Sequence, residues 1–286
     1  EAKLKEVVKT YPWVQMVLYS ELAPQGVELQ RAEPMPGPTE AAFCEMARQH
    51  QVWLLPGSMY ERDGDRVYNT TPVIDPEGRV VGRYRKQFPF HPYEDGVSDG
   101  DRFLVFDVPE VGRFGVSICY DMWFPETSRT LAAMGAEVIL HPSLTATIDR
   151  DIELSIARAT AAVNQCYMID INGVGDGGYG RSIVCAPDGR VLYEADRDEE
   201  IIPVEIDLER VRRARRYGVL RLGQALKSFR DRTVDFPVYE RDQASPYLAA
   251  LGELEKPTRS AMAGHDPMPG PAEDERAAAA GKNGRR

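Results

Sequence analysis

Short runs rich in Val, Ile and Leu alternate with amphipathic stretches along most of the chain, and this alternation constrains the fold more than any other feature. The predicted strands cover residues 14–21, 52–61, 66–75, 79–86, 103–108, 113–119, 136–143, 166–173, 181–187, 190–196 and 201–207, and the predicted helices residues 1–10, 39–50, 125–135, 151–165 and 208–216. Strands that alternate with helices, with some strand pairs in direct succession, indicate a layered α/β domain with a mixed sheet. We expect it to span residues 1–255.

The bulk composition excludes some classes of partner. The chain has 286 residues, of which 43% are hydrophobic, so it can bury one sizeable core. Its net charge of -10 disfavours nucleic acid and anionic membranes as partners. No apolar run approaches the roughly 20 residues that span a bilayer. Residues 256–286 are rich in Ala, Gly, Pro and charge, which predicts a flexible tail or one draped over a partner.

The cysteines and histidines show no metal-binding pattern. The four cysteines form no CxxC motif, and the four histidines form neither HxH nor HExxH. We therefore expect no metal. In a chain of this length the cysteines are interpreted as reduced thiols of a cytoplasmic protein.

Cys119 is the candidate nucleophile. It ends the apolar strand of GVSIC and precedes a helix that begins at Pro125. A thiol at such a strand end can be exposed at the edge of a sheet, where backbone N–H groups stabilise an oxyanion. The alternative is a buried, inert core cysteine, which is the commoner place for a free thiol.

Two charged residues lie at comparable positions. Glu21 and Lys86 each end a predicted strand, and open α/β sheets build their sites at the carboxyl ends of strands. A hydrolase needs a nucleophile, a base and an oxyanion donor, and these residues could supply the last two. Taken singly, each could instead be a solvated charge at a strand end.

The segments around these residues resemble the nitrilase, or carbon–nitrogen hydrolase, superfamily. SEL around Glu21 resembles the motif of the catalytic glutamate, although Ser20 stands where the family usually has proline. GRYRKQFPF resembles the lysine motif, and GVSICYDMWFPE resembles the nucleophile motif, which is the most specific of the three. The resemblance runs from about residue 12 to residue 210.

The resemblance implies an αββα sandwich whose subunits pair, as a homodimer or a larger homo-oligomer, so that two sandwiches stack. It also implies that Glu21 is the general base and that Lys86 and the backbone N–H of Tyr120 hold the oxyanion. Glu94 matches a further acidic position that orients the lysine or helps proton transfer; a solvated loop carboxylate is the alternative. No cofactor is implied. Family members usually begin with a strand before the first helix, so we expect that this sequence lacks that strand.

The reaction and the substrate are less constrained. Tyr120-Asp121 after the nucleophile resembles the amidase branches, whereas nitrilases usually carry Trp-Glu there. A small-molecule amide or carbamoyl amide is therefore preferred over a nitrile, and a catalytically silent scaffold is a third hypothesis. Four residues are candidates for the substrate pocket, although each could equally be core or interface packing: Tyr93, Trp123, Leu144 and Thr145. We expect Asn69 to make structural hydrogen bonds or to lie near the pocket, and His141 to be a packed polar residue.

Overall fold

The computed structural model describes residues 1–175, 177–239 and 245–254. Its described residues divide into two units: one within Glu1–Phe90 and Gly96–Arg230, and one formed by His91–Asp95 with the described residues after Arg230. The first unit ends before the expected domain boundary at residue 255, which stays a prediction. The predicted tail, residues 256–286, lies outside the described residues.

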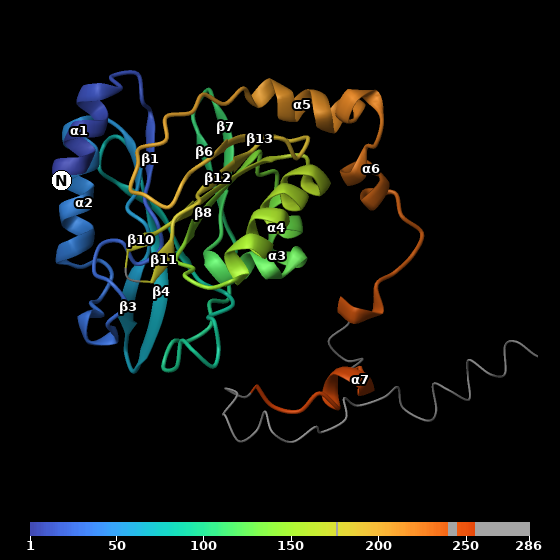
Figure 1. Ribbon diagram of the computed structural model, residues 1–286, viewed down its shortest axis with the longest axis horizontal. Coiled ribbons are helices and arrows are strands. Elements are labelled where there is room, and N and C mark those ends of the chain that lie inside the picture. Colours follow the sequence, from blue (N-terminus) through green and yellow to red (C-terminus); the bar gives the residue numbers. More distant parts are fainter. Residues whose placement is uncertain (176, 240–244, 255–286) are drawn as a thin grey trace, which may run out of the picture. The chain divides into compact units, whose positions relative to one another are not determined.

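The helices of the first unit flank its sheets (Figure 1). They are α1 (Ala2–Thr10), α2 (Pro38–His50), α3 (Pro125–Ala133), α4 (Asp149–Asn164), α5 (Leu208–Tyr217) and α6 (Ala225–Arg230), with 3-10 turns η1 (Leu29–Arg31), η2 (Cys119–Trp123) and η3 (Val219–Arg221). Proline occupies the first position of α2 and α3, where its missing N–H costs no hydrogen bond. The second unit contains η4 (Pro237–Tyr239) and α7 (Pro246–Ala249).

Two mixed sheets form the centre of the first unit. One contains β1 (Met16–Leu18), β2 (Trp53–Leu55), β3 (Met59–Asp63), β4 (Arg66–Ile74) and β5 (Val80–Arg85). The other contains β6 (Leu104–Val108), β7 (Gly112–Val116), β8 (Val138–Ser143), β9 (Tyr167–Asn172), β12 (Ile183–Cys185) and β13 (Val191–Glu194). A separate hairpin pairs β10 (Val174–Gly175) with β11 (Gly178–Tyr179).

Strand direction explains where a site can form. In the first sheet β1 and β2 are parallel, whereas the pairs that β4 forms with β2, β3 and β5 are antiparallel. In the second sheet β7, β8 and β9 are parallel and adjacent, so their carboxyl ends lie along one edge. Cys119 and Thr145 follow two of these ends.

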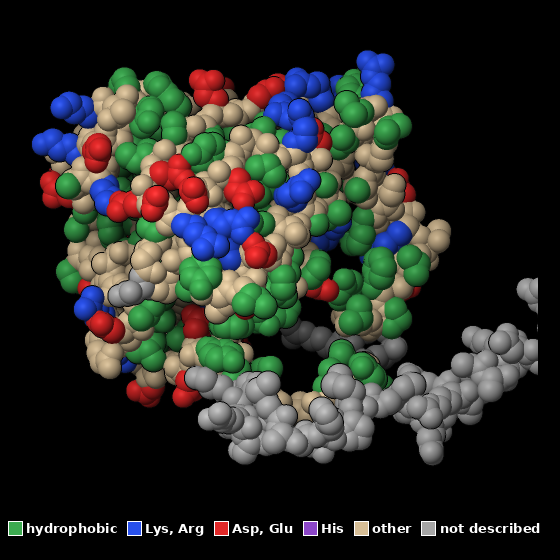
Figure 2. All heavy atoms as spheres, viewed as in Figure 1, with side chains coloured by type: hydrophobic (Ala, Val, Ile, Leu, Met, Phe, Trp, Pro, Cys, Tyr) green, Lys and Arg blue, Asp and Glu red, His purple; other side chains and the backbone are tan. Residues whose placement is uncertain are grey.

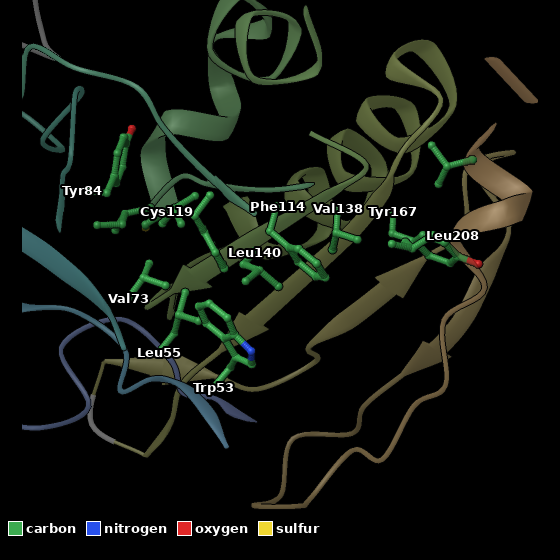
Figure 3. Close-up of a cluster of buried hydrophobic side chains, with 14 of the residues drawn as sticks. Trp53, Leu55, Val73, Tyr84, Phe114, Cys119, Val138, Leu140, Tyr167 and Leu208 are labelled. Atoms are coloured by element: carbon green, nitrogen blue, oxygen red, sulfur yellow. The ribbon is translucent and has the colours of Figure 1, made fainter. Parts of the chain in front are cut away.

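Three apolar clusters define four layers. One cluster joins the two sheets through side chains such as Trp53, Leu55 and Val116; Figure 3 shows this cluster. A second lies between α3, α4 and the second sheet, and a third between α1, α2 and the first sheet. Each sheet therefore has apolar packing on both faces, although the edge strand β13 is exposed, and the predicted αββα sandwich is confirmed. On the face drawn in Figure 2, acidic and basic side chains of the described residues are interspersed.

The predicted strand over residues 52–61 is wrong as one element. It is divided into β2 and β3 by Pro56 and Gly57. Gly57 has a φ of +84°, which extended strands do not adopt, and its missing side chain lets the Ser20 carbonyl approach. The chain therefore changes direction beside Glu21.

The predicted strand over residues 201–207 is also wrong. The segment alternates between exposed and half-buried residues, but it forms no strand ladder. At its end, the Tyr167 hydroxyl donates to the Asp207 carbonyl at 3.1 Å and accepts from its N–H at 3.2 Å. A side chain thus supplies hydrogen bonds that a neighbouring strand would otherwise provide.

Candidate active site

Glu21 and Lys86 form a buried ion pair. Glu21 follows β1 by three residues and Lys86 directly follows β5. Lys86 Nζ donates to Glu21 Oε1 at 2.9 Å, and the two side chains are 1% and 3% exposed. Asn69 Nδ2 donates to the same oxygen at 2.8 Å. Two residues, Asn69 in β4 and Lys86 directly after β5, thus donate to the carboxylate of Glu21.

The backbone holds both charged residues in place. The Lys86 N–H donates to the Asn69 carbonyl at 2.8 Å, and the Lys86 carbonyl accepts from Gly100 at 2.8 Å. The Glu21 N–H donates to the Ser143 carbonyl at 3.3 Å, which connects the first sheet to the end of β8 in the second. A site supported from two sheets loses little geometry to local motion.

Cys119 lies in a sharp turn between β7 and α3. Its φ is 47°, in the left-handed region, which costs a non-glycine residue about 1–2 kcal/mol. Such strain at a single residue is typical of functional sites, where the surrounding structure maintains it. Cys119 is 8% exposed and lies at one end of the cluster between the sheets, with Leu208 at the opposite end (Figure 3).

The Cys119 thiol has a pKa raised well above its ordinary value. Burial is the main cause, and the negative charge of Glu21 adds to it. The positive charge of Lys86 and the backbone N–H of Leu144 act in the opposite direction, while Glu153 raises the thiol pKa further. The resting sulfur is therefore a thiol at neutral pH, so it needs a base before it can attack.

Asp121 is an important residue that sequence reasoning did not assign to the site. Its Oδ1 accepts the backbone N–H groups of Gln87 at 3.1 Å and Phe88 at 2.9 Å. Its Oδ2 accepts from the Tyr84 hydroxyl at 2.7 Å and from the Ile118 N–H at 2.8 Å. The carboxylate therefore joins the turn after Lys86 to the turn of the nucleophile. Burial raises its pKa to about 6, although these hydrogen bonds oppose the rise.

The predicted pocket residues differ in where they lie. Thr145 Oγ1 is 3.9 Å from Cys119 Sγ, and Leu144 directly precedes it, so both lie beside the nucleophile. Trp123 lies in η2, with Nε1 3.5 Å from Glu153 Oε1. Tyr93 belongs to the second compact unit. Substrate binding by these four residues stays a prediction.

Two further predicted roles also stay predictions. Glu94 is half-buried and belongs to the second unit. Tyr120 lies in η2, and its ring packs 4.9 Å from that of Phe90. The assignment of its N–H as an oxyanion donor therefore depends on the family resemblance.

His141 is packed inside the second sheet. It is fully buried, and its Nδ1 lies 2.7 Å from Ser117 Oγ. Burial lowers its pKa to about 4, so the ring is neutral at pH 7. Among the described residues, no group of three or more His, Cys, Asp and Glu side chains is arranged to hold a metal ion. Over the same residues, no helix is both long and apolar enough to cross a membrane.

Asp121 and Glu153 were not assigned to the site from the sequence, and only Asp121 has a local pattern that could have identified it. Asp121 stands two positions after the nucleophile, a spacing that a search for turn-stabilising carboxylates could have found. Glu153 lies 34 residues after Cys119 in a helix with many charges, and nothing in its local pattern distinguishes it. Only the fold brings it next to Thr145.

Comparison with known proteins agrees with this geometry. The family model described as carbon–nitrogen hydrolase matches residues 4–216. An (R)-stereoselective amidase from a Pseudomonas species is 37% identical over 192 residues, which cover 65% of this chain and 69% of the relative. A formamidase from Bacillus cereus is 29% identical over 235 residues, which cover 75% of this chain and 70% of the relative.

Solved structures show the same fold. A carbon–nitrogen hydrolase from Helicobacter pylori has a TM-score of 0.71 at 28% identity, covering 85% of this chain and 91% of that one. Nit3 from Saccharomyces cerevisiae, a member of the nitrilase superfamily, has a TM-score of 0.69 at 28% identity, covering 75% and 84%. The chain belongs to the carbon–nitrogen hydrolase family. Its similarity to amidases places it among the amidase-type hydrolases, as the nucleophile motif indicates.

Proposed function

We propose that this hydrolase cleaves small-molecule amides or carbamoyl amides through a thioester at Cys119, with Glu21 as general base and Lys86 as oxyanion donor. The observation that carries the proposal is the buried ion pair of Lys86 and Glu21, whose charges both act on the Cys119 thiol. Because that thiol is protonated at rest, a carboxylate in this position supplies the base that attack requires.

The acylation step follows from these roles. Glu21 takes the proton of the Cys119 thiol, and the sulfur attacks the carbonyl carbon as its π electrons move to oxygen. Lys86 Nζ and the Tyr120 N–H stabilise that oxyanion. When the oxyanion collapses, the carbon–nitrogen bond breaks and the leaving nitrogen takes the proton from Glu21. Ammonia or an amine departs and a thioester remains.

Hydrolysis of the thioester restores the enzyme. Glu21 removes a proton from water as the water oxygen attacks the thioester carbon. The carbon–sulfur bond breaks, the sulfur regains a proton from Glu21, and a carboxylic or carbamic acid leaves. Glu94 is proposed to orient Lys86 or to assist these proton transfers, as the resemblance implies.

Amide substrates are preferred over nitriles for two reasons. Tyr120-Asp121 follows the nucleophile, as in amidase branches. The relatives similar to this chain include an (R)-stereoselective amidase and a formamidase. A nitrilase is the alternative that the experiment must separate from the amidase.

The test is ammonia release from a panel of aliphatic, aromatic and carbamoyl amides with matched nitriles. The native chain, Cys119→Ala and the control Cys44→Ala, which removes a half-buried thiol on α2, are compared. We expect turnover on amides that is lost only in Cys119→Ala. Turnover on nitriles alone would reverse the preference for amides, and activity that survives in Cys119→Ala would refute the nucleophile.

We further propose a homodimer or larger homo-oligomer. Two apolar side chains are exposed at the start of α4. Ile148, the residue before the helix, is 81% exposed, and Ile152 in the first turn is 45% exposed. These two side chains lie four residues apart in sequence, and packing against a second copy of the chain would cover both. Light scattering should give a mass at least twice the 32.0 kDa of one chain. A monomer at micromolar concentration would contradict this proposal.

A further inference from the structure

A line of hydrogen bonds leads from the nucleophile to a buried carboxylate that the proposed chemistry does not use. Cys119 Sγ lies 3.9 Å from Thr145 Oγ1. Thr145 Oγ1 in turn lies 3.1 Å from Glu153 Oε1, on α4. This line approaches the sulfur from the second sheet and α4, whereas Glu21 and Lys86, whose charges act on its pKa, follow strands of the first sheet.

Glu153 is held firmly on both carboxylate oxygens. Its Oε2 accepts from Arg150 Nη1 at 3.1 Å, and the same nitrogen lies 2.8 Å from Asp170 Oδ2. The side chains of Arg150 and Glu153 are 2% and 3% exposed. The guanidinium of Arg150 favours the ionised form of Glu153, but burial and the charge of Asp170 outweigh it and raise the carboxyl pKa above its ordinary value.

The chemistry of the groups sets the direction of the hydrogen bonds. An ionised carboxylate only accepts, so the single hydroxyl proton of Thr145 is donated to Glu153. The lone pairs of Thr145 Oγ1 then face the sulfur, where they can accept the S–H of Cys119 but cannot stabilise a thiolate.

We propose that Glu153 is a positioning residue that acts through Thr145 to hold Cys119 as an oriented, protonated thiol in the resting site. This inference depends on the proposed function only in taking Cys119 as the nucleophile. The thiol then forms a thiolate when Glu21 removes its proton, rather than spontaneously. A resting thiol of this kind reacts slowly with stray electrophiles and oxidants.

Electrostatics supports the same direction. Burial raises the pKa of Cys119 most, and the charges of Glu21 and Glu153 raise it further. Lys86 and the Leu144 N–H lower it. Around Glu153 itself, burial and Asp170 raise the carboxyl pKa, while Arg150 and the hydrogen bond from Thr145 lower it.

The test follows alkylation of Cys119 by iodoacetamide as a function of pH on the full chain. Trypsin releases Cys119 in the peptide of residues 114–129, which contains no other cysteine, so mass spectrometry reads this thiol alone. We expect Glu153→Gln to lower the pH midpoint by about one unit, equal to roughly tenfold faster alkylation below the midpoint, because the Thr145 hydroxyl is no longer held by a carboxylate and can donate to the thiolate.

Variants of Thr145 test the route of the effect. Thr145→Ser keeps the hydroxyl and should keep the native midpoint, whereas Thr145→Val removes the acceptor of the S–H and should lower it. In the Thr145→Val background, Glu153→Gln should shift the midpoint by less than half its effect in the native chain. An equal shift in both backgrounds would mean that Glu153 acts directly through space, and would overturn the relay.

Glu40→Gln is the matched control. Like Glu153, Glu40 is a buried carboxylate paired with an arginine: it is 2% exposed and lies 2.6 Å from Arg83. It lies on α2 and pairs with a residue of β5, however, and not on α4. Its loss should leave the Cys119 midpoint unchanged. A folded Glu153→Gln with the native midpoint overturns the proposal. If that variant does not fold, equal midpoints for Thr145→Val and Thr145→Ser overturn it. Since alkylation needs no turnover, a chain inactive on every amide still gives a result.

Discussion

Lys86 Nζ and Glu21 Oε1 lie 2.9 Å apart across 65 residues of sequence, and both side chains are almost completely buried. Each charge in such a pair is shielded from water and depends on the other for stabilisation. Removing either residue should therefore change both the reaction and the free energy of unfolding, and the two effects can be measured separately. The two charges also act on the Cys119 thiol with opposite sign.

Glu21→Gln should lower kcat by about 10²–10⁴-fold, the usual contribution of a general base, while KM changes less. Gln can still accept the hydrogen bonds from Lys86 and Asn69 through its amide oxygen. Because the Glu21 charge raises the pKa of Cys119, the alkylation midpoint of the thiol should fall. Steady-state kinetics and alkylation measure the two effects, and an unchanged kcat would refute the base assignment.

Lys86→Met should move the thiol the other way. The Lys86 charge lowers the pKa of Cys119, so its loss should raise the alkylation midpoint. The variant also leaves Glu21 buried without a cation, which should lower the free energy of unfolding by about 3–5 kcal/mol. Urea denaturation measures this loss. A midpoint that falls, as in Glu21→Gln, would contradict the opposed action of the two charges.

Asp121→Asn should weaken both stability and activity. The amide nitrogen would replace an oxygen that accepts from Tyr84 or Ile118, or from the N–H groups of Gln87 and Phe88. Leaving a buried donor unpaired costs about 1–3 kcal/mol. Tyr84→Phe removes one hydrogen bond and keeps the carboxylate, so it should cost about 1 kcal/mol with kcat nearly intact. Equal losses of kcat in the two variants would contradict the prediction, because they would show that activity does not depend on the hydrogen bonds that the Asp121 carboxylate makes to the turn of the nucleophile.

His141 should contribute to acid destabilisation. Burial lowers its pKa from 6.5 to about 4, so the folded state favours the neutral ring. The unfolded state then binds more protons below pH 6.5, and stability from this residue is lost as the pH falls from 6.5 towards 4, by about 3 kcal/mol. His141→Asn should lack this loss.

The difference between His141→Asn and the native chain isolates this residue from other groups. Asp121 titrates in the same range with the opposite sign, because its pKa is raised to about 6. Urea denaturation at pH 4.5 and 7 gives the comparison. Parallel stability curves for the two proteins would contradict a neutral, buried His141.

Gly57→Ala should displace the turn that contains Glu21. A Cβ at this residue would lie 1.9 Å from the Ser20 carbonyl, and its φ of +84° is unfavourable for alanine. Gly64→Ala is the control, since its φ is +61° but no atom lies within 4 Å of the added Cβ. Gly64→Ala should lower the free energy of unfolding by about 1 kcal/mol and leave kcat unchanged. Gly57→Ala should lose more, with a fall in kcat, and matching losses would show that only φ strain matters.

The predicted strands and helices were largely correct because their signal is local, whereas the four layers were expected from the family resemblance. Alternating apolar residues and proline at helix starts are short-range patterns, and they located β4, β8, α2 and α4 within a few residues. The two wrong strands failed for different reasons. At Gly57 the break in the strand depends on the close approach of the Ser20 carbonyl, which a local pattern does not reveal. Residues 201–207 have strand-like alternation but no neighbouring strand to pair with.

The order of residue types and motifs was enough to identify the layered α/β class and the family, and to propose Glu21, Lys86 and Cys119 as the catalytic residues. Only the tertiary structure placed Asn69 on Glu21 and Glu153 on Thr145. Asn69 and Glu21 are 48 residues apart and become neighbours only when the strands pack together. Thr145 and Glu153 are only eight residues apart, and they meet because the chain turns between β8 and α4.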